Sequence, residues 1–199
     1  NNASIVTSES IVYKQATKTK TYRKIKNRKK RLQRALSRKY LKANPNDTTK
    51  SIISNNYKKN KSLIRKLDKR LMNIRDDCHN KIITDILLQP PKTIVLEDLY
   101  VSEMASRESR KEMTYIEKQA SKNIVEASLR KFRMLLTSRI RRYDVNMVIA
   151  DKYYPSTKMC NKCGYVKEMK LKDRVYKCDC CGLTIDRDLN AAINLANYK

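Results

Sequence analysis

The sequence predicts a mixed α/β protein with a long basic helical hairpin and an inserted ribbon that holds four cysteines. Three observations indicate this class. Basic residues dominate two long helix-forming stretches, two short apolar runs flank a third such stretch, and two Cys-x-x-Cys pairs stand near the C-terminus. The 199 residues include only two glycines and four prolines, which argues against a protein made mainly of loops. Helix is therefore expected to dominate.

The charge of the chain indicates the kind of partner it has. It carries 46 Lys and Arg against 20 Asp and Glu, a formal net charge of +26. So large an excess opposes compaction through self-repulsion, and a polyanionic partner would relieve it. Nucleic acid is the first candidate and an anionic membrane the second. Because no apolar run approaches the roughly 20 residues that span a bilayer, we expect a cytoplasmic nucleic-acid-binding protein without a membrane partner.

The N-terminal part is expected to form a short hairpin followed by a basic helix. Residues 3–13 contain two β-prone runs around a Ser-Glu-Ser turn. From Lys14 to Lys42 there are 14 basic residues and no acidic one, with an apolar stripe at spacing four. A helix that only needed solubility would carry mixed signs, so this stretch predicts a nucleic-acid-binding face. The stripe is Leu32, Leu36 and Tyr40, and the candidate binding residues are Lys29, Lys30, Arg31, Arg34, Arg38 and Lys39.

A second long helix is predicted from about Thr49 to Leu88, after a break at residues 44–47. Its apolar side chains recur at gaps of four and three, which places them on one face. Pro90 and Pro91 end it. We expect the two helices to pack as an antiparallel pair, apolar faces inward and basic faces outward. The apolar positions are Leu63, Leu67, Leu71, Ile74, Cys78 and Ile82.

Two apolar runs, residues 92–99 and 145–150, are predicted to be buried strands covered on both faces. Between them, residues 113–143 are expected to form a helix. The order of strand, helix and strand favours a crossover connection and an α/β core. The apolar face of this helix is predicted to contain Val125, Leu129, Phe132, Leu136 and Ile140.

The two cysteine pairs are the most specific signal in the chain. Their spacing, with 14 residues between the pairs, is typical of a structural zinc ribbon with four thiolate ligands and no open position for water. Chance thiols or a redox Cys-x-x-Cys are the alternatives. Gly164 and Gly182 follow the two pairs, where a tight turn needs a positive φ. Cys180 could compete as a ligand, but the repeated Cys-Gly favours Cys181. The predicted ligands are Cys160, Cys163, Cys178 and Cys181.

Three carboxylates stand at the predicted ends of elements. Glu97 ends the first apolar strand, and Asp186 and Asp188 open a predicted helix over residues 186–195. From the residues alone, both aspartates could be helix N-caps and Glu97 could be a surface carboxylate. Chemistry and capping therefore remain open at this point.

Four segments resemble, in order, the C-terminal half of TnpB/OrfB proteins, the transposon-encoded RNA-guided DNA nucleases. A generic zinc ribbon would not share the flanking segments, so the resemblance is specific. Two upstream segments, residues 32–42 and 74–82, are similar to the basic helical region of the same family. The four segments are IVLEDL (residues 94–99), YPSTKMCNKCG (154–164), YKCDCCG (176–182) and DRDLNAAINL (186–195).

The resemblance implies an RNase H-like (RuvC) core, related to type V CRISPR effectors, that cuts a DNA target directed by a guide RNA. It also implies three carboxylates around Mg²⁺, a cation that takes oxygen ligands. By motif match Glu97 is the second carboxylate and Asp188 the third, with Asp186 a possible neighbour. Such a protein would associate with the nucleoid when bound to DNA.

The same resemblance suggests how the chain is divided. Residues 1–150 would form the RuvC-like core, with the basic helical region at about 14–89. Residues 151–182 would form the ribbon, and residues 183–199 the last RuvC helix. The family's first catalytic Asp lies on a strand just before the segment that matches residues 1–13. We therefore expect an N-terminally incomplete core, as a fragment or a decayed copy, and no cleavage by the chain as given.

Two other functions fit the sequence. A nuclease-dead DNA- or RNA-binding protein, such as a repressor, would need the basic residues and the ribbon but neither Glu97 nor Asp188. A transposase with a DNA strand-transfer role can use the same carboxylates, so the sequence separates it poorly from a nuclease. A comparison of DNA joining with plain cleavage would distinguish the last two.

Overall fold

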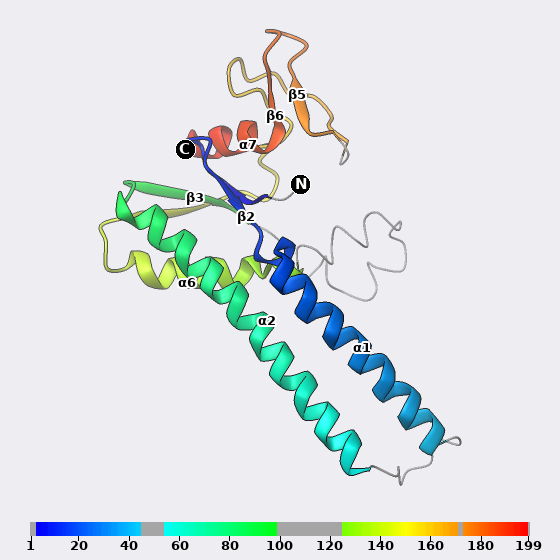
Figure 1. Ribbon diagram of the computed structural model, residues 1–199. Helices are drawn as coiled ribbons and strands as arrows, with labels where there is room; N and C mark the ends of the chain where they lie inside the picture. Colours follow the sequence, from blue (N-terminus) through cyan, green and yellow to red (C-terminus); the bar gives the residue numbers. More distant parts are fainter. Residues whose placement is uncertain (1–2, 45–53, 99–124, 171–172, 199) are drawn as a thin grey trace. The chain divides into compact units, whose positions relative to one another are not determined.

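The computed structural model describes residues 3–44, 54–98, 125–170 and 173–198, which divide into two units (Figure 1). One unit covers residues 16–79. The other combines the described parts of residues 1–15 and 80–199. The boundary falls inside a single long helix, α2 (Asn55–Leu88), after His79. The predicted break at residues 45–47 and the first five residues of the predicted second helix, 49–53, lie outside the described residues.

The helical unit begins later than the sequence predicted. A short 3-10 helix, η1 (Ala16–Lys18), precedes α1 (Lys20–Ala43). The hydroxyl of Thr19 accepts a hydrogen bond of 3.2 Å from the amide of Tyr22 and so caps α1. Helix α2 starts in the same way, because the amide of Tyr57 donates to the hydroxyl of Ser54 over 3.2 Å. The predicted start at Lys14 was therefore wrong, since these hydroxyl caps decide where each helix begins.

Helices α1 and α2 are antiparallel, as predicted. Lys29 of α1 forms an ion pair with Asp68 of α2. Further along α1, the ring of Tyr40 lies 6.0 Å from that of Tyr57, which is earlier in α2. Contacts that advance along one helix and recede along the other require opposite directions. The buried core of the pair consists of Tyr22, Ile25, Leu67 and Leu71, with Leu32 and Ile74 partly buried against it.

The second unit contains three separate two-stranded sheets. Two pairs are antiparallel hairpins and one is parallel, so the predicted N-terminal hairpin is confirmed. The second strand of the N-terminal hairpin is tied to the end of α2, since the hydroxyl of Tyr13 donates to Asp85 over 2.6 Å. The pairs are β1 (Ala3–Val6) with β2 (Val12–Lys14), β3 (Thr93–Glu97) with β4 (Asn146–Ala150), and β5 (Val175–Lys177) with β6 (Thr184–Asp186).

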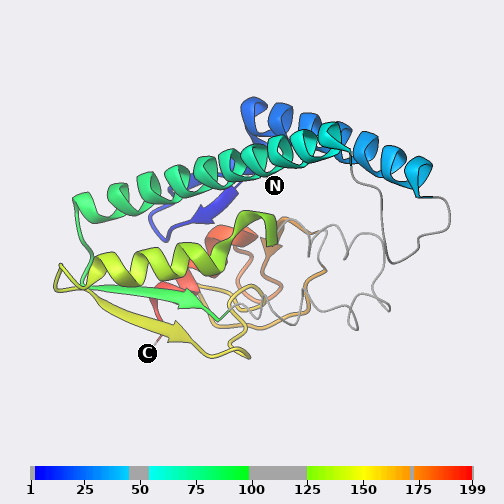
Figure 2. The same cartoon turned by 90° about the horizontal axis from the view of Figure 1, so that it is seen from below.

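Helix α6 (Leu129–Ile140) lies alongside the parallel pair β3–β4, as both views show (Figure 2). Phe132, Leu136 and Ile140 are buried on it, which confirms most of the predicted apolar face. The strand, helix and strand order therefore gives a parallel pair with a helix against it. Among the described helices, none is long and apolar enough to cross a membrane.

The helix predicted over residues 113–143 is interrupted within its described part and ends earlier than predicted. Ser128 has a left-handed φ of 56°, which separates a helical turn at residues 125–127 from α6. Because this break changes the phase of the helix, Val125 is 40% exposed and Ala127 is buried in its place. Helix α6 ends at Ile140, followed by a turn, rather than at Tyr143. Residues 113–124 of the prediction lie outside the described residues.

The two apolar strands are less buried than predicted. The three central residues of β3 and the matching three of β4 are half-buried, because each strand pairs only with the other among the described residues. Leu99, the predicted end of the first strand, lies outside the described residues. In the described part of the chain the hairpin β1–β2 forms its own sheet. The fold of the described residues is thus mixed α/β, with three two-stranded sheets.

The packing of α1 on α2 predicts how much stability is lost when a buried side chain between them is shortened. Leu71 is 6% exposed within the buried cluster. Leu71→Ala should lower the free energy of unfolding by about 2–5 kcal/mol, because it removes apolar contacts and leaves a cavity. Urea denaturation followed by far-UV circular dichroism measures this. Met72→Ala is the matched control, since Met72 is 41% exposed on the same helix. Equal losses in both variants would contradict the burial of Leu71 between α1 and α2.

Candidate metal centre and neighbouring carboxylates

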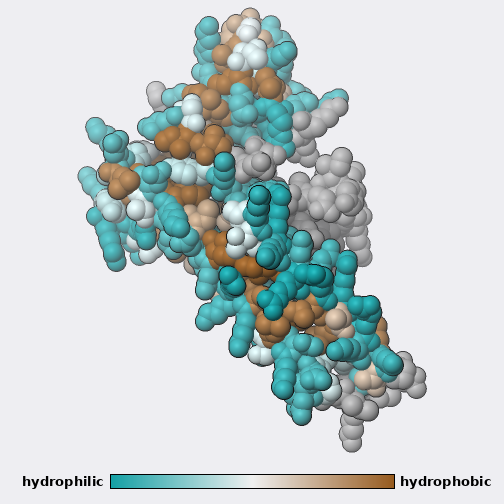
Figure 3. Space-filling model, in the orientation of Figure 1, coloured by the Kyte–Doolittle hydropathy of each residue, from teal (hydrophilic) through white to brown (hydrophobic). Residues whose placement is uncertain are grey.

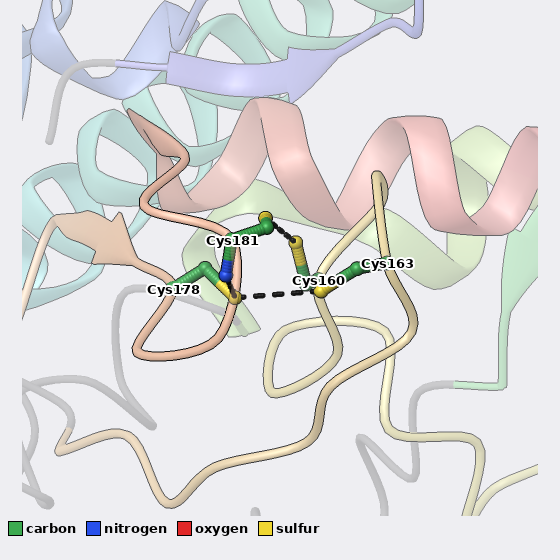
Figure 4. Close-up of side chains that lie close together, drawn as sticks. All are labelled: Cys160, Cys163, Cys178 and Cys181. Atoms are coloured by element: carbon green, nitrogen blue, oxygen red, sulfur yellow. Dashed lines mark hydrogen bonds between the residues drawn. The ribbon is translucent and has the colours of Figure 1, made fainter.

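The sulfurs of four cysteines converge where the two Cys-x-x-Cys turns face each other (Figure 4). All four Sγ atoms lie within 4.8 Å of one another. Two separations cross between the pairs, at 3.7 Å from Cys160 to Cys181 and 3.5 Å from Cys163 to Cys178. Cys180 is exposed and is not part of the cluster. The arrangement can hold a metal ion such as zinc.

The two cysteine pairs sit on turns with the same backbone hydrogen bonds. In each turn the amide of the first cysteine donates to a carbonyl five residues later, and its carbonyl accepts from a glycine amide four residues later. Gly164 and Gly182 have φ values of 77° and 71°, as predicted, where a side chain would cost about 1–2 kcal/mol. The bonds are Cys160 N to Tyr165 O (2.8 Å), Cys178 N to Leu183 O (2.8 Å), Gly164 N to Cys160 O (2.9 Å) and Gly182 N to Cys178 O (3.1 Å).

The thiols of the cluster do not titrate alike. A backbone hydrogen bond from Cys181 lowers the pKa of Cys178 to about 6, and its amide lies 3.5 Å from the Cys178 sulfur. The backbone of Tyr165 also lowers the pKa of Cys163, but desolvation and the three neighbouring thiols outweigh it and raise that pKa to about 12. The Cys178 thiolate therefore forms readily, whereas a metal would have to displace the proton of the Cys163 thiol.

Glu97 and Asp98 are adjacent at the end of β3 but have different partners. The hydroxyl of Ser156 donates to Oε1 of Glu97 over 2.6 Å. The carboxylate of Asp98 instead pairs with the guanidinium of Arg133 over 2.9 Å. Asp98 is thus held by a cation on α6, and Glu97 by a neutral donor on the segment that leads into the ribbon.

The two aspartates at the start of α7 (Arg187–Ala196) also differ. Asp186 is the N-cap, and its side chain accepts from the amides of Asp188 (2.9 Å) and Leu189 (3.1 Å). Capping is therefore the correct interpretation for Asp186 but not for Asp188. Asp188 lies in the first turn, 3.3 Å from the guanidinium of Arg187.

Helix α7 contacts both β3 and β1, so the element that carries Asp188 packs against the strand that carries Glu97. The structure brings these two elements together, but no group of three metal-ligating side chains forms there among the described residues. Within the described ranges, the four cysteines are the one group of three or more His, Cys, Asp or Glu side chains close enough for a single ion.

Sequence reasoning missed three polar residues that join these features. Ser156, Asn190 and Asn194 are 5%, 0% and 2% exposed. Asn194 donates through Nδ2 to the carbonyls of Ser156 (2.8 Å) and Met159 (2.7 Å), and Asn190 donates to Met159 as well (2.7 Å). The spacing of the two asparagines, four residues apart beside two alanines, was the available signal for a buried helix face.

Five of the six candidate nucleic-acid-binding residues are exposed on α1: Lys30, Arg31, Arg34, Arg38 and Lys39. Figure 3 shows hydrophilic residues over much of the visible face of α1 and α2. Lys29 is different, because its side chain is 24% exposed and paired with Asp68. Lys29 therefore lies at the contact between α1 and α2 rather than on the exposed face of α1.

Comparison with known proteins shows what this arrangement is similar to. Residues 130–195 match the family model "Cas12f1-like, TNB domain". A protein of Streptomyces pristinaespiralis named as a candidate RNA-guided DNA endonuclease is 30% identical over 143 residues, 71% of this chain and 33% of that protein. A protein of the same description from Mycobacterium tuberculosis is 29% identical over 136 residues, 68% of this chain and 28% of that protein. TnpB-like protein L79 of Acanthamoeba polyphaga mimivirus is 28% identical over 153 residues, 75% and 28% respectively.

The fold and the site define a basic α/β protein with a four-cysteine ribbon between a parallel strand pair and a final helix. The matches confirm the predicted resemblance to TnpB/OrfB-type proteins. The family match covers α6, β4, the cysteine cluster and nearly all of α7. The chain spans about a third, or less, of the length of these relatives.

Proposed function

We propose that this chain supplies a zinc ribbon, two Mg²⁺-binding carboxylates and a basic helical surface to an RNA-guided DNA nuclease with a RuvC-like core. One observation carries the proposal. The strand that bears Glu97 lies against the helix that bears Asp188, and this helix is hydrogen-bonded to the backbone on both sides of Cys160. The names of the relatives, which describe RNA-guided DNA endonucleases and TnpB-like proteins, support it.

The cysteine cluster fits a structural zinc ion. A Zn–S distance of about 2.3 Å in a tetrahedron gives sulfurs about 3.8 Å apart. The separations of 3.7 Å from Cys160 to Cys181 and 3.5 Å from Cys163 to Cys178 are close to this value. Four thiolates leave no coordination position for water, so the ion would hold the ribbon together and take no part in hydrolysis.

Adjacent cysteines provide a matched test of the zinc ligands. Cys181→Ser should reduce bound zinc far below one equivalent at low free zinc, because an oxygen replaces a thiolate in the cluster. Cys180→Ser should retain the wild-type zinc content, since Cys180 is exposed outside the cluster. Elemental analysis of the purified, dialysed proteins measures both. A loss of zinc in Cys180→Ser with none in Cys181→Ser would exchange the two assignments.

Glu97 and Asp188 are the residues that would hold Mg²⁺. When bound, paired Mg²⁺ ions activate water and stabilise the leaving oxygen of a phosphodiester. The chain's own residues prepare the ligands. Ser156 orients the Glu97 carboxylate through its hydrogen bond, and Asp186 fixes the backbone of Asp188 by capping α7. Asp98 forms an ion pair with Arg133 on α6 and is not part of the proposed set.

Neighbouring aspartates offer the corresponding control for Mg²⁺. With Mn²⁺ as a paramagnetic probe, Glu97→Gln and Asp188→Asn should each weaken binding several-fold, because each removes a charged oxygen ligand. Asp186→Asn should bind Mn²⁺ like the wild type, since Asn caps a helix as well as Asp does. Electron paramagnetic resonance of free Mn²⁺ gives the affinities. Equal weakening by Asp186→Asn and Asp188→Asn would remove the distinction between cap and ligand.

The exposed basic residues of α1 would hold the phosphate backbone of nucleic acid. Helix α1 carries no acidic residue, so nothing along it opposes an approaching phosphate chain. Contacts of this kind position the backbone and carry little sequence information. Specificity would then come from pairing between a guide RNA and its DNA target, the partners that the relatives' names imply.

Charge-matched variants on the two helices test this surface. Replacing Lys30, Arg31 and Arg34 with Gln should flatten the dependence of log affinity on log salt by about 2–3 units, because about one counterion is released per phosphate contact. The same replacement of Lys66, Lys69 and Arg70 on α2 should have a smaller effect. Fluorescence anisotropy with single-stranded RNA and duplex DNA measures both slopes. Equal slopes for the two triple variants would mean that α1 is not the preferred face.

A further inference from the structure

We propose that Asn190, Asn194 and Ser156 couple the metal state of the cysteine cluster to the positions of Glu97 and α7. The inference rests on the proposed zinc and Mg²⁺ sites, and it assigns Ser156 and the two asparagines as positioning residues. In this arrangement a loaded ribbon is a condition for an assembled carboxylate site.

The first half of the coupling fixes the backbone on both sides of Cys160, a proposed zinc ligand. Met159, directly before Cys160, accepts hydrogen bonds of 2.7 Å from both Asn190 and Asn194 through its carbonyl. Asn161, directly after Cys160, donates its amide to Oδ1 of Asn190 over 3.1 Å. The backbone on both sides of Cys160 is therefore fixed to α7. A shift of this cysteine cannot leave the helix unaffected.

The second half leads to the carboxylate. The Nδ2 group of Asn194 that contacts Met159 also donates to the carbonyl of Ser156 over 2.8 Å. The hydroxyl of the same serine donates to Glu97 over 2.6 Å. One buried carboxamide thus holds the turn before the first cysteine and the residue that orients Glu97. The ring of Tyr154 adds a bond in the same segment, from its hydroxyl to the carbonyl of Asn194 at 3.0 Å.

Burial makes these contacts strongly interdependent. Asn190 and Asn194 are almost fully buried, and a buried amide without an acceptor is costly. A ribbon of this kind owes much of its order to the metal. When the metal leaves, Met159 and Asn161 lose their fixed positions, and α7 loses the partners of its two carboxamides. Binding linkage is reciprocal, so the same bonds should strengthen zinc binding.

Zinc release measures the first half. In the whole 199-residue protein, loaded with zinc and mixed with excess chromogenic chelator, Asn190→Ala and Asn194→Ala should release zinc about tenfold faster than the wild type. Asn194→Asp, which keeps the volume but removes the donor, should do the same if the alanine variant folds poorly. Asn197→Ala is the control, because Asn197 is exposed at the end of the same helix. Unchanged release in the Asn194 variants would overturn the coupling.

Hydrogen exchange separates coupling from simple support. In the wild type, removal of zinc should speed the exchange of α7 amides by about tenfold or more, as these amides lose their anchored helix. In Asn194→Ala the difference between zinc-loaded and zinc-free protein should shrink. A purely structural role would shift both states equally and leave that difference unchanged, as in a mutant cycle without interaction. This second result would overturn the inference.

Substitution of Ser156 separates the effect on Glu97 from the effect on the cysteine cluster. Ser156→Ala should weaken the Mn²⁺ probe several-fold while zinc release stays at the wild-type rate, because only the hydroxyl contacts Glu97 and the backbone carbonyl still accepts from Asn194. Metal analysis of the same samples identifies which idea fails. A wild type without zinc would overturn both the proposed ribbon and the coupling. A zinc-loaded wild type whose α7 amides exchange at the same rate after zinc removal would overturn the coupling alone.

Discussion

The pairing of two buried carboxamides on α7 is the constraint on which the second unit depends. Asn190 and Asn194 lie on one face of a ten-residue helix with almost no access to water. They find their acceptors on the chain between β4 and the first cysteine, more than thirty residues earlier. Leaving either amide unpaired would cost roughly 1–3 kcal/mol, so the helix and the turn are stable only together. The ribbon and the neighbouring carboxylates both depend on this attachment.

The features that local sequence determines were predictable. Cysteine spacing and the following glycines define the two turns, whose hydrogen bonds involve residues no more than five positions apart. The periodicity of α1 and α2 likewise predicted an antiparallel pair. The errors arose where one residue changes a local pattern. The left-handed Ser128 breaks a helix whose apolar spacing looked continuous, and Thr19 moves a helix start by its cap.

The features that depend on distant contacts were not predictable. Lys29 looked equivalent to its basic neighbours, because a helix stripe does not show which side chain will meet Asp68 on the second helix. The burial of β3 was overestimated, since an apolar run does not reveal how many strands will flank it. The hydrogen bond from Ser156 to Glu97 spans 59 positions, and nothing in either local segment points to the other.

The capping role of Asp186 has a consequence for how such sequences vary. Its side chain accepts two backbone amides, a task that serine, threonine or asparagine performs nearly as well. Two positions later, Asp188 has no such substitutes if it binds a hard cation, because a neutral side chain cannot supply the charge. The same short segment therefore combines an interchangeable acid with an irreplaceable one. Loss of the first is a tolerable drift in the sequence, and loss of the second marks a copy that has given up its chemistry.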